Sequence, residues 1–394
     1  MNPITTKPGG DPIRILYIID TLGGEGGAEL SLLRLIRHLP PERFRCRVIT
    51  FHNRNPEFLK EFPCRVDHWE LKRVYGWRAA VVAAHLRNIV RRDRIDIVHS
   101  FFPTSDLWAA PIARACGARI LISSRRDMGI VRAGKHRLLY RALQGMFDQI
   151  QAVSEAVRQF TIQADGVDPA RAVTIHNGVE PWTASVCARD PSRVRIACIA
   201  NWRPVKGIDV LVRAAAKVGS RDDRALFWIA GNPGAGEYRR EVESLCRSLG
   251  ADRWIHFLGA SPQARDLLER SDLFVLPSRS EGLSNALLEA MQSGLACVAS
   301  DAGGNSEVVV HGTTGLLFPA GDDNALAEKI LELMANPARR ERMGGAGRKR
   351  VAEQFSVKAM VERVMTSYET LLEKKAAGAR SGTSRRKVGD ELAL

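Results

Sequence analysis

The chain has 394 residues, of which 45% are hydrophobic, and this length exceeds what one compact core usually holds, so two domains are expected. Its seven Cys are scattered with no CxxC pair, which excludes a disulfide scaffold and a structural zinc site, and no stretch approaches the ~20 apolar residues of a transmembrane helix. The net charge of +14 favours an anionic partner: nucleic acid, an anionic membrane surface or an anionic small ligand.

Apolar strand-like segments alternate with helical patterns in the first half of the chain, and a helix is expected over residues 28–38. This alternation predicts a parallel sheet covered by helices on both faces. The predicted strands are residues 13–19, 46–51, 64–69, 95–100, 118–123, 149–153 and 172–175.

A glycine-rich loop, Gly23-Gly24-Glu25-Gly26-Gly27, follows the first predicted strand. A dinucleotide-binding fingerprint requires G-x-G-x-x-G, and here Glu29 occupies the third glycine position. The loop is therefore predicted not to bind NAD. It can bring backbone close to a ligand, with Gly26 and Gly27 presenting N–H groups ahead of the helix, although a plain tight turn remains an alternative.

A second series of strands begins after a joint over residues 181–191, so the fold class is α/β with two doubly wound parallel-sheet domains. The N-terminal domain covers 11–185 and the C-terminal domain 190–354. A closing helix begins near residue 357, and residues 377–394 are expected to form a basic flexible tail. The strands of the second series are residues 194–200, 225–230, 254–258, 273–276, 295–299 and 316–318.

A cationic loop, Arg203-Pro204-Val205-Lys206-Gly207, follows the first strand of the second series. The forked guanidinium of Arg203 and the point charge of Lys206 both suit a diphosphate. An R-x-x-K motif on a protein surface often contacts only water, and that reading remains an alternative. This one follows a buried strand, which predicts that it lies at the carboxyl edge of the sheet, where open α/β folds bind ligands.

The stretch 278–309 has the order loop, helix, strand and glycine-rich turn. Ser284 is predicted to cap the helix, which Gly294 ends. Glu281 and Glu289 are then expected near the helix N-terminus, where backbone N–H groups favour a phosphate. Carboxylates beside a phosphate suit sugar or ribose hydroxyls, so the pattern predicts a phosphate flanked by polyols. Each Glu taken alone could equally be an ordinary surface charge.

Together these motifs resemble glycosyltransferase family 4, the group 1 glycosyltransferases, over residues 13–354. The family consists of retaining enzymes of the GT-B architecture, in which two Rossmann-like doubly wound parallel-sheet domains face each other across a cleft. The pair of Glu separated by seven intervening residues, combined with the R-x-x-K loop, is the specific signal. The matching segments are GGAE (26–29), RPVKG (203–207), EGLSNALLEAM (281–291) and AGGNSEVV (302–309).

The resemblance implies a role for each matching position. Arg203 and Lys206 would bind the donor diphosphate, Glu289 the ribose, and Glu281 the transferred sugar. The final helix, residues 355–376, would cross back to the N-terminal domain. The other implied substrate-binding positions are Ser284, Asn285 and Ala286 at the distal phosphate, Gly231, Asn232 and Leu258 around the base, Gly303 and Gly304 at the glycine-rich turn, and Gly26 and Gly27 from the N-terminal domain.

One position departs from the family pattern. Many members carry a His after the fifth strand of the first domain, whereas this chain has Ser124-Arg125-Arg126 there. Arg126 is the expected replacement and would place a positive charge near the leaving phosphate. His99, at another strand end, is either a packed residue or a site residue.

The expected activity is retaining, metal-independent transfer of a sugar from a nucleotide-diphosphate donor of UDP or GDP type, with no cofactor and no metal site. The expected acceptor is a lipid-linked or polysaccharide precursor. A GT-B-shaped epimerase or phosphorylase, or a basic membrane- or nucleic-acid-binding module, would be alternatives. The base, the sugar and the acceptor stay open.

Basic side chains are spread along helical stretches such as 77–94 and 135–147, without an aromatic-interleaved nucleic-acid motif, so no nucleic acid partner is expected. An anionic membrane surface is a further candidate partner, because each basic side chain adds about 1 kcal/mol there. The first ten residues lack an apolar signal core. The missing signal core predicts a cytoplasmic protein, and the basic charge predicts that it lies peripherally at the inner face of the membrane.

Overall fold

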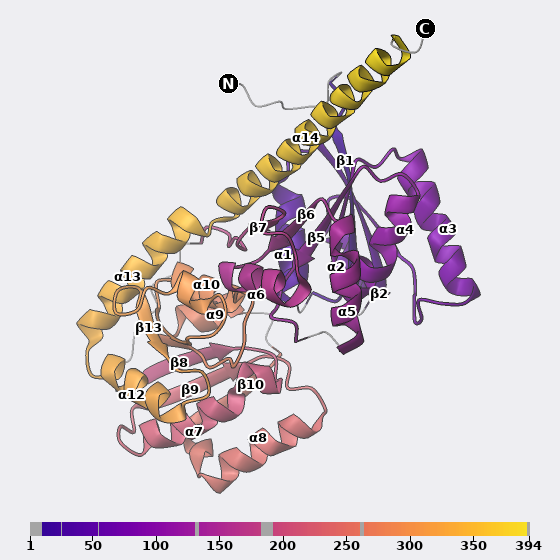
Figure 1. Ribbon diagram of the computed structural model, residues 1–394. Helices are drawn as coiled ribbons and strands as arrows, with labels where there is room; N and C mark the ends of the chain where they lie inside the picture. Colours follow the sequence, from indigo (N-terminus) through magenta and orange to yellow (C-terminus); the bar gives the residue numbers. More distant parts are fainter. Residues whose placement is uncertain are drawn as a thin grey trace. The chain divides into compact units, whose positions relative to one another are not determined.

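The computed structural model describes residues 10–391 except Glu25, Arg54, 131–133, 183–191 and 261–263 (Figure 1). The chain forms two compact units. The first unit comprises Met1–Val153, Val157–Ile175 and Met360–Leu394, and the second comprises Ser154–Ala156 and His176–Ala359. From residue 183 onward, the joint predicted over 181–191 lies outside the described residues.

The first unit contains a parallel sheet in the order β3-β2-β1-β4-β5-β6-β7. Its central strand β1 pairs with β2 on one side and β4 on the other, so Ile15 lies between Cys46 and Ile97. Burial on both faces explains why the strands are continuous apolar runs in the sequence. The strands are β1 (Ile13–Leu22), β2 (Phe44–Asn53), β3 (Arg65–His68), β4 (Ile97–Phe101), β5 (Ile120–Arg125), β6 (Gln149–Ala152) and β7 (Ala172–Thr174).

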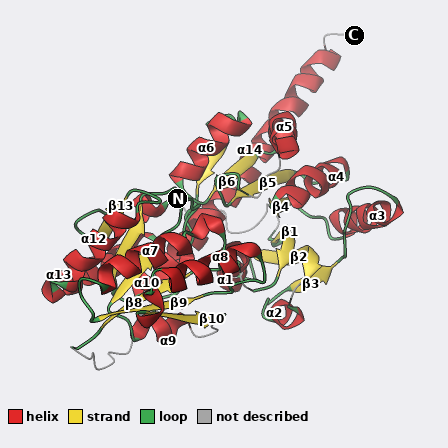
Figure 2. Cartoon of the chain, turned by 90° about the horizontal axis from the view of Figure 1, so that it is seen from below, coloured by secondary structure: helices red, strands yellow, loops and turns green. Residues whose placement is uncertain are grey.

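Helices connect the strands of the first unit and pack against the sheet (Figure 2). In α3, a buried stripe that includes Val82, Leu86 and Ile89 repeats at helical spacing and contributes to the unit's core. The helices are α1 (Gly27–His38), α2 (Pro56–Lys60), α3 (Trp77–Arg92), a π-helical turn (Ser105–Ala109), α4 (Ala110–Ala115), α5 (Gly134–Leu143), a 3₁₀ turn (Gln144–Met146) and α6 (Glu155–Asp165).

The second unit contains a parallel sheet in the order β10-β9-β8-β11-β12-β13. Its strands are β8 (Val194–Ile199), β9 (Ala225–Ala230), β10 (Ile255–Gly259), β11 (Leu273–Leu276), β12 (Ala296–Ser300) and β13 (Gly315–Phe318). Its helices are α7 (Ile208–Gly219), α8 (Glu237–Ser248), α9 (Ala264–Glu269), α10 (Asn285–Gln292), α11 (Asn305–Val308), α12 (Asp323–Met334) and α13 (Pro337–Gln354). Every strand predicted from the sequence is present, and two doubly wound units confirm the predicted fold class.

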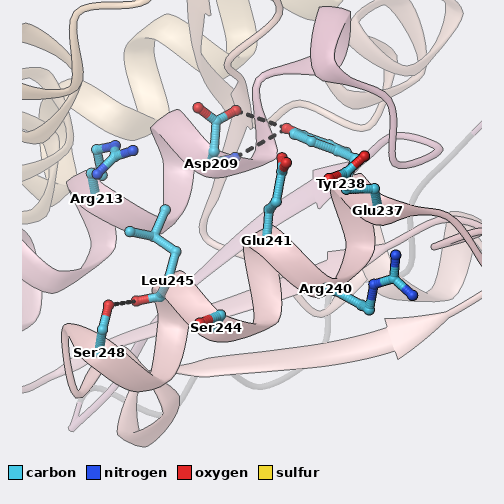
Figure 3. A pocket seen from close by; sticks show the side chains of 9 residues that line it. All are labelled: Asp209, Arg213, Glu237, Tyr238, Arg240, Glu241, Ser244, Leu245 and Ser248. Carbon is cyan, nitrogen blue, oxygen red and sulfur yellow. Dashed lines mark hydrogen bonds between the residues drawn. The ribbon is translucent and has the colours of Figure 1, made fainter.

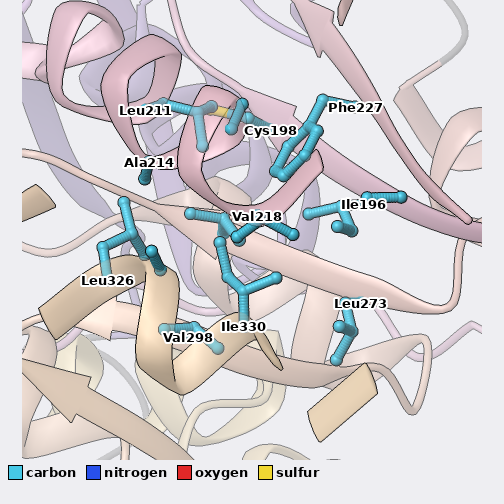
Figure 4. Close-up of a cluster of buried hydrophobic side chains, with 14 of the residues drawn as sticks. Ile196, Cys198, Leu211, Ala214, Val218, Phe227, Leu273, Val298, Leu326 and Ile330 are labelled. Carbon is cyan, nitrogen blue, oxygen red and sulfur yellow. The ribbon is translucent and has the colours of Figure 1, made fainter. Parts of the chain in front are cut away.

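The core of the second unit lies between its sheet and helices α7 and α12 (Figure 4). Ile196, Phe227 and Val298 project from three strands toward Leu211 of α7 and Ile330 of α12, and all five are at most 1% exposed. Full burial of such a side chain is worth about 1.5–3 kcal/mol, so this contact fixes the sheet that carries the site loops.

Helix α14 (Val357–Glu391) closes the chain, and its residues from Met360 belong to the first unit. It is longer than predicted, because residues 377–391, which were expected to belong to a flexible tail, continue it. The segment contains no Pro, and each of its Gly residues costs only about 1 kcal/mol in a helix that is already nucleated. No helix within the described ranges is both long enough and apolar enough to cross a lipid bilayer.

The chain passes between the units after residues 153, 156, 175 and 359. Glu307 of the second unit binds residues next to two of these crossings, which belong to the same unit. Its carboxylate accepts hydrogen bonds from the backbone N–H groups of Glu155 and Ala156 and lies 2.9 Å from Nε2 of His176. Burial alone would raise the pKa of Glu307, but these hydrogen bonds hold it below its usual value.

Candidate active site

The predicted site residues of the second unit lie along one edge of its sheet. All strands of this sheet are parallel, so the loops at their carboxyl ends meet at that edge. The chain runs outward from β8 to β10 and then returns to β11 on the other side of β8, which makes β8/β11 the topological switch point. In strand order β10-β9-β8-β11-β12, the edge carries Leu258, Gly231–Asn232, Arg203–Lys206, Glu281–Ser284 and Gly303–Gly304.

An ion pair joins the two loops at the switch point. Nζ of Lys206 lies 2.6 Å from Oε1 of Glu281, and the hydroxyl of Ser278 donates to the same oxygen at 2.7 Å. Glu281 is 5% exposed. Lys206 ends a 3₁₀ turn (Pro204–Lys206) in the loop that follows β8. Arg203, the residue before this turn, is exposed and forms no ion pair with the described residues. The cationic loop and the acidic loop are therefore brought together as the sequence predicts.

Glycines allow these loops to approach each other closely. At Gly207, where φ is +66°, an added Cβ would lie 2.1 Å from the carbonyl oxygen of Pro277. At Gly303, where φ is +55°, it would lie 1.8 Å from the carbonyl oxygen of Glu281. The N–H of Gly304 donates to the carbonyl of Gly282 at 3.1 Å. The backbone that carries Glu281 is thus held against the turn after β12.

Replacing Gly303 by alanine is expected to displace the Glu281 loop and to weaken binding of the sugar donor that the family resemblance implies. The new Cβ would collide with a backbone oxygen, and a non-glycine residue at positive φ adds about 1–3 kcal/mol of strain. Thermal unfolding with and without a nucleotide-sugar measures both effects. Gly312→Ala is the matched control, because Gly312 has φ of +79° but nothing within 4 Å of an added Cβ. Equal loss of donor binding in both variants would contradict the steric argument.

Arg279 clamps the cationic loop, a role that sequence reasoning missed. Its guanidinium binds both carboxylate oxygens of Asp209, at 2.8 and 2.6 Å, and the carbonyl of Pro204 at 2.8 Å. Its backbone N–H donates to the carbonyl of Val205 at 2.8 Å. Burial alone would raise the pKa of Asp209, but hydrogen bonds from Arg279 and from the hydroxyl of Tyr238 hold it below its usual value.

Asp209 and Tyr238 also border an open pocket of about 680 Å³ between α7 and α8 (Figure 3). Acidic and basic side chains share its lining, and none of the predicted site residues belongs to it. The remaining lining residues are Arg213, Glu237, Arg240, Glu241, Ser244, Leu245 and Ser248. The structure therefore separates this pocket from the row of site residues along the sheet edge.

Helix α10 starts beside Glu281 with the predicted cap. The hydroxyl of Ser284 accepts from the N–H of Leu287 at 3.3 Å, and the side-chain oxygen of Asn285 accepts from Nδ2 of Asn177 at 2.8 Å. The first N–H groups of a helix have no acceptor within it and lie at its positive dipole end. Glu289, half-buried, follows one turn later.

The positions assigned to the base lie at the other end of the row. The backbone of Asn232 is held by Trp202, whose N–H donates to its carbonyl at 2.9 Å, and by Oδ1 of Asn201, which accepts from its N–H at 2.9 Å. Gly231, with φ of +141°, approaches Ala200 so closely that an added Cβ would lie 2.0 Å from its carbonyl oxygen. Leu258 on β10 is 45% exposed.

In the first unit, the glycine loop after β1 is closed by Glu29. Oε2 of Glu29 accepts the N–H groups of Gly23 and Gly24, at 2.8 and 2.7 Å. Gly26 caps α1 and Gly27 is its first residue. The acid that excluded the dinucleotide fingerprint is therefore the residue that shapes this loop.

Arg126 follows β5 at the carboxyl edge of the first unit's sheet and is half-buried. Burial lowers its pKa to about 10, so it remains cationic at neutral pH. His99 lies within β4 and is 2% exposed, with Nδ1 2.8 Å from the hydroxyl of Tyr368. Burial, together with the charge of Arg126, lowers the pKa of His99 to about 3. His99 is therefore a packed, neutral residue.

Among the residues that the structure describes, no group of three or more His, Cys, Asp or Glu could hold a metal ion. Residues 188–350 match the family of glycosyl transferases group 1, and residues 25–182 match glycosyltransferase family 4. Two doubly wound units of this kind define the GT-B class. The chain belongs to family 4 of the glycosyltransferases, the group 1 enzymes, and is a glycosyltransferase.

Individual relatives agree with this assignment. N-acetyl-alpha-D-glucosaminyl L-malate synthase of Bacillus anthracis is 26% identical over 307 residues, covering 74% of this chain and 77% of that protein. Alpha-maltose-1-phosphate synthase of Mycobacterium tuberculosis is 35% identical over 240 residues, covering 55% of this chain and 62% of that protein. The crystal structure of Anabaena HepE with UDP and glucose has a TM-score of 0.78 at 20% identity, covering 89% of this chain and 98% of that one.

Proposed function

We propose that the protein transfers a sugar from a UDP- or GDP-type nucleotide-diphosphate sugar, with retention of configuration, to a lipid-linked or polysaccharide precursor. The observation that carries the donor assignment is the contact of Lys206 with Glu281 at the β8/β11 switch point, beside the N-terminus of α10. A cation, a helix end and a carboxylate within one site suit a phosphate flanked by sugar hydroxyls.

Breaking the bond between the sugar and the diphosphate develops negative charge on the leaving group. In this proposal, Arg203, Lys206 and the first N–H groups of α10 stabilise that charge. Each well-placed donor in such a site is worth about 10²–10³ in rate. We propose that these groups do so without a divalent ion, and turnover in a chelator tests this part of the proposal.

The remaining roles follow the order of loops along the sheet edge. The base would lie near Gly231, Asn232 and Leu258, and Glu289 would bind the ribose hydroxyls. Glu281 would bind the transferred sugar, next to the backbone of Gly303 and Gly304. For Arg126, Gly26 and Gly27 of the first unit we keep the roles that the family resemblance implies, with Arg126 as a source of positive charge. Family membership supports retention, with the leaving phosphate accepting the acceptor's proton.

The acceptor assignment rests on charge. A net charge of +14 favours an anionic lipid surface, and a precursor linked to lipid would be presented there. We therefore propose a cytoplasmic enzyme that works at the inner face of the membrane.

A panel of UDP-, GDP- and ADP-sugars in a thermal-unfolding assay tests the donor proposal. A donor that binds only the folded protein stabilises it by about 2.7 kcal/mol at a concentration of 100 times Kd. We expect a shift with one UDP- or GDP-sugar, and none for that donor with Lys206→Ala. No shift with any member of the panel, or an equal shift for the variant, would contradict the proposal. Product formed without an acceptor would indicate an epimerase instead.

A further inference from the structure

The loop before α3 and the first turns of that helix expose large apolar side chains to solvent. Trp77 is 73% exposed, Tyr75 69%, Val74 46% and Val81 45%. Exposed apolar residues are ordinary when they occur singly. Here they gather within eight consecutive positions, with two aromatic residues among them. The exposed residues of 72–92 are called the α3 surface below.

The α3 surface is basic as well as apolar. Residues 71–92 contain six Lys or Arg and no Asp or Glu. The guanidinium of Arg73 lies 5.9 Å from the ring centroid of Tyr75, and that of Arg78 lies 5.4 Å from the ring of Trp77. Each aromatic ring is thus paired with a cation. The equally arginine-rich α8 differs, because Glu237, Glu241 and Glu243 lie among its arginines.

Helix geometry orders these side chains into stripes. The inner face of α3, which includes Val82, Leu86 and Ile89, is buried in the core of the first unit. On the outer face, Trp77, Val81 and Ala84 share one line at spacings of four and three residues. Exposed arginines lie on both sides of that line: Arg78 and Arg92 on one side, Arg87 and Arg91 on the other.

We propose that the α3 surface docks the enzyme on an anionic lipid bilayer. Trp and Tyr rings favour the boundary between water and hydrocarbon, and flanking arginines bind lipid phosphates. Nucleic acid would bind the arginines of the α3 surface, but it offers no apolar layer for Val74 and Val81. It therefore fits this surface less well than a bilayer does. This inference rests on the proposed function, because a lipid-linked acceptor gives the docking its purpose.

The position of the surface within the first unit fits that role. The segment leading to α3 follows the carboxyl end of β3, and the backbone N–H groups of Trp69 and Leu71 bind the carbonyls of Thr50 and Phe51 on β2. This is the edge of the sheet where the Gly23–Gly27 loop and Arg126 lie. β3 is two strands from β1, about 10 Å at the usual strand spacing. A docked bilayer would thus meet the carboxyl edge of this sheet.

Co-sedimentation of the full chain with vesicles tests the proposal without any donor. Phosphatidylcholine vesicles are compared with vesicles that also contain phosphatidylglycerol, at low and high salt. We expect preference for the anionic vesicles, with binding about 25-fold weaker in the R73Q/R78Q variant, since each basic side chain at such a surface contributes about fivefold. We expect Y75A/W77A to lose the binding that survives high salt.

Two matched variants control for charge and apolarity. R240Q/R247Q removes two exposed arginines from α8, and L249A/V310A removes two exposed apolar side chains from the second unit, of which Leu249 is 43% and Val310 41% exposed. Both are expected to bind vesicles as the unmodified protein does. Equal binding to neutral and anionic vesicles, or loss confined to a control variant, would overturn the proposal. So would a dimer in sedimentation analysis that the Y75A/W77A variant abolishes.

Donor binding separates failure of this inference from failure of the proposed function. The thermal shift with a nucleotide-sugar is measured on the same preparations, and none of the substituted residues belongs to the donor site. A protein that binds donor but not anionic vesicles would refute only the docking surface. A protein that binds vesicles but no donor would refute only the transferase mechanism.

Discussion

Replacing Lys206 by alanine is expected to lower sugar transfer by about 10²–10³ or more, because the variant loses the cation that, in the proposed mechanism, stabilises the leaving diphosphate. Its expected effect on stability is small, about 1 kcal/mol, since the Lys206 side chain is 28% exposed and ends a single 3₁₀ turn. Glu281 would keep its hydrogen bond from Ser278. Turnover of donor and acceptor, measured beside thermal unfolding, separates the two effects.

Lys217→Ala is the matched control for this experiment. Lys217 lies on α7 in the same unit and forms an ion pair with Asp323, away from the row of site residues. Transfer by this variant should be normal. Near-normal transfer by Lys206→Ala would remove the diphosphate from the site described here, whatever the result for Lys217.

The second large effect is expected at Asp106, whose replacement by alanine should lower the free energy of unfolding by about 3–5 kcal/mol. Its carboxylate binds Nη1 of Arg125 at 2.6 Å and accepts from the hydroxyls of Tyr140 at 2.9 Å and Ser100 at 2.6 Å. Arg125 is 2% exposed and lies 3.9 Å from the centroid of the Tyr140 ring. The variant would leave a buried guanidinium without its counter-ion.

The electrostatics of Arg125 support this expectation. Burial alone would lower its pKa, but the nearby charge of Asp106 raises it above the usual value. Its Nε and Nη2 have no hydrogen-bond partner among the described residues, so Asp106 supplies most of the compensation for burial. Because Arg125 directly precedes Arg126, loss of this anchor should also disturb the cation assigned to the active site.

A double-mutant cycle in urea tests the pair. The double variant Asp106→Leu with Arg125→Met should recover much of the loss, because apolar side chains of similar size often replace a buried ion pair at little cost. Arg224→Ala is the comparison, since the exposed pair of Arg224 with Asp222 should contribute within about 1 kcal/mol. A loss for Asp106→Ala no larger than for Arg224→Ala would show that the buried pair contributes little.

The sequence predicted the sheets because strands buried on both faces are continuous apolar runs that end at turn residues. The features of the site that depend on neighbouring residues were also predictable. Ser284 caps α10 in the structure, and Gly294, with φ of +84°, follows that helix. The charges of Arg203 and Lys206 follow a buried strand, and this order alone assigns them to the sheet edge.

Contacts between distant parts of the sequence were not predictable in the same way. Arg279 lies 70 positions from Asp209, and Asn177 lies 108 positions from Asn285, yet each pair shapes a site loop. Neither pair has a local pattern, because the strand order decides which loops become neighbours. Glu29 illustrates a third case, since its spacing from Gly23 and Gly24 is local but its hydrogen bonds depend on the fold of the glycine loop.

The first unit combines the beginning and the end of the chain, and this affects how it folds during synthesis. Its sheet leaves the ribosome early, but Tyr368 of α14, fully buried against this sheet, comes near the end of translation. The hydroxyl of Tyr368 lies 3.1 Å from that of Tyr17 and 2.8 Å from Nδ1 of His99. Until that helix emerges, a nascent chain exposes this polar and aromatic face. The first unit, whose sheet is synthesised first, is therefore completed last. A chain truncated before residue 360 should be recognised by chaperones and proteases.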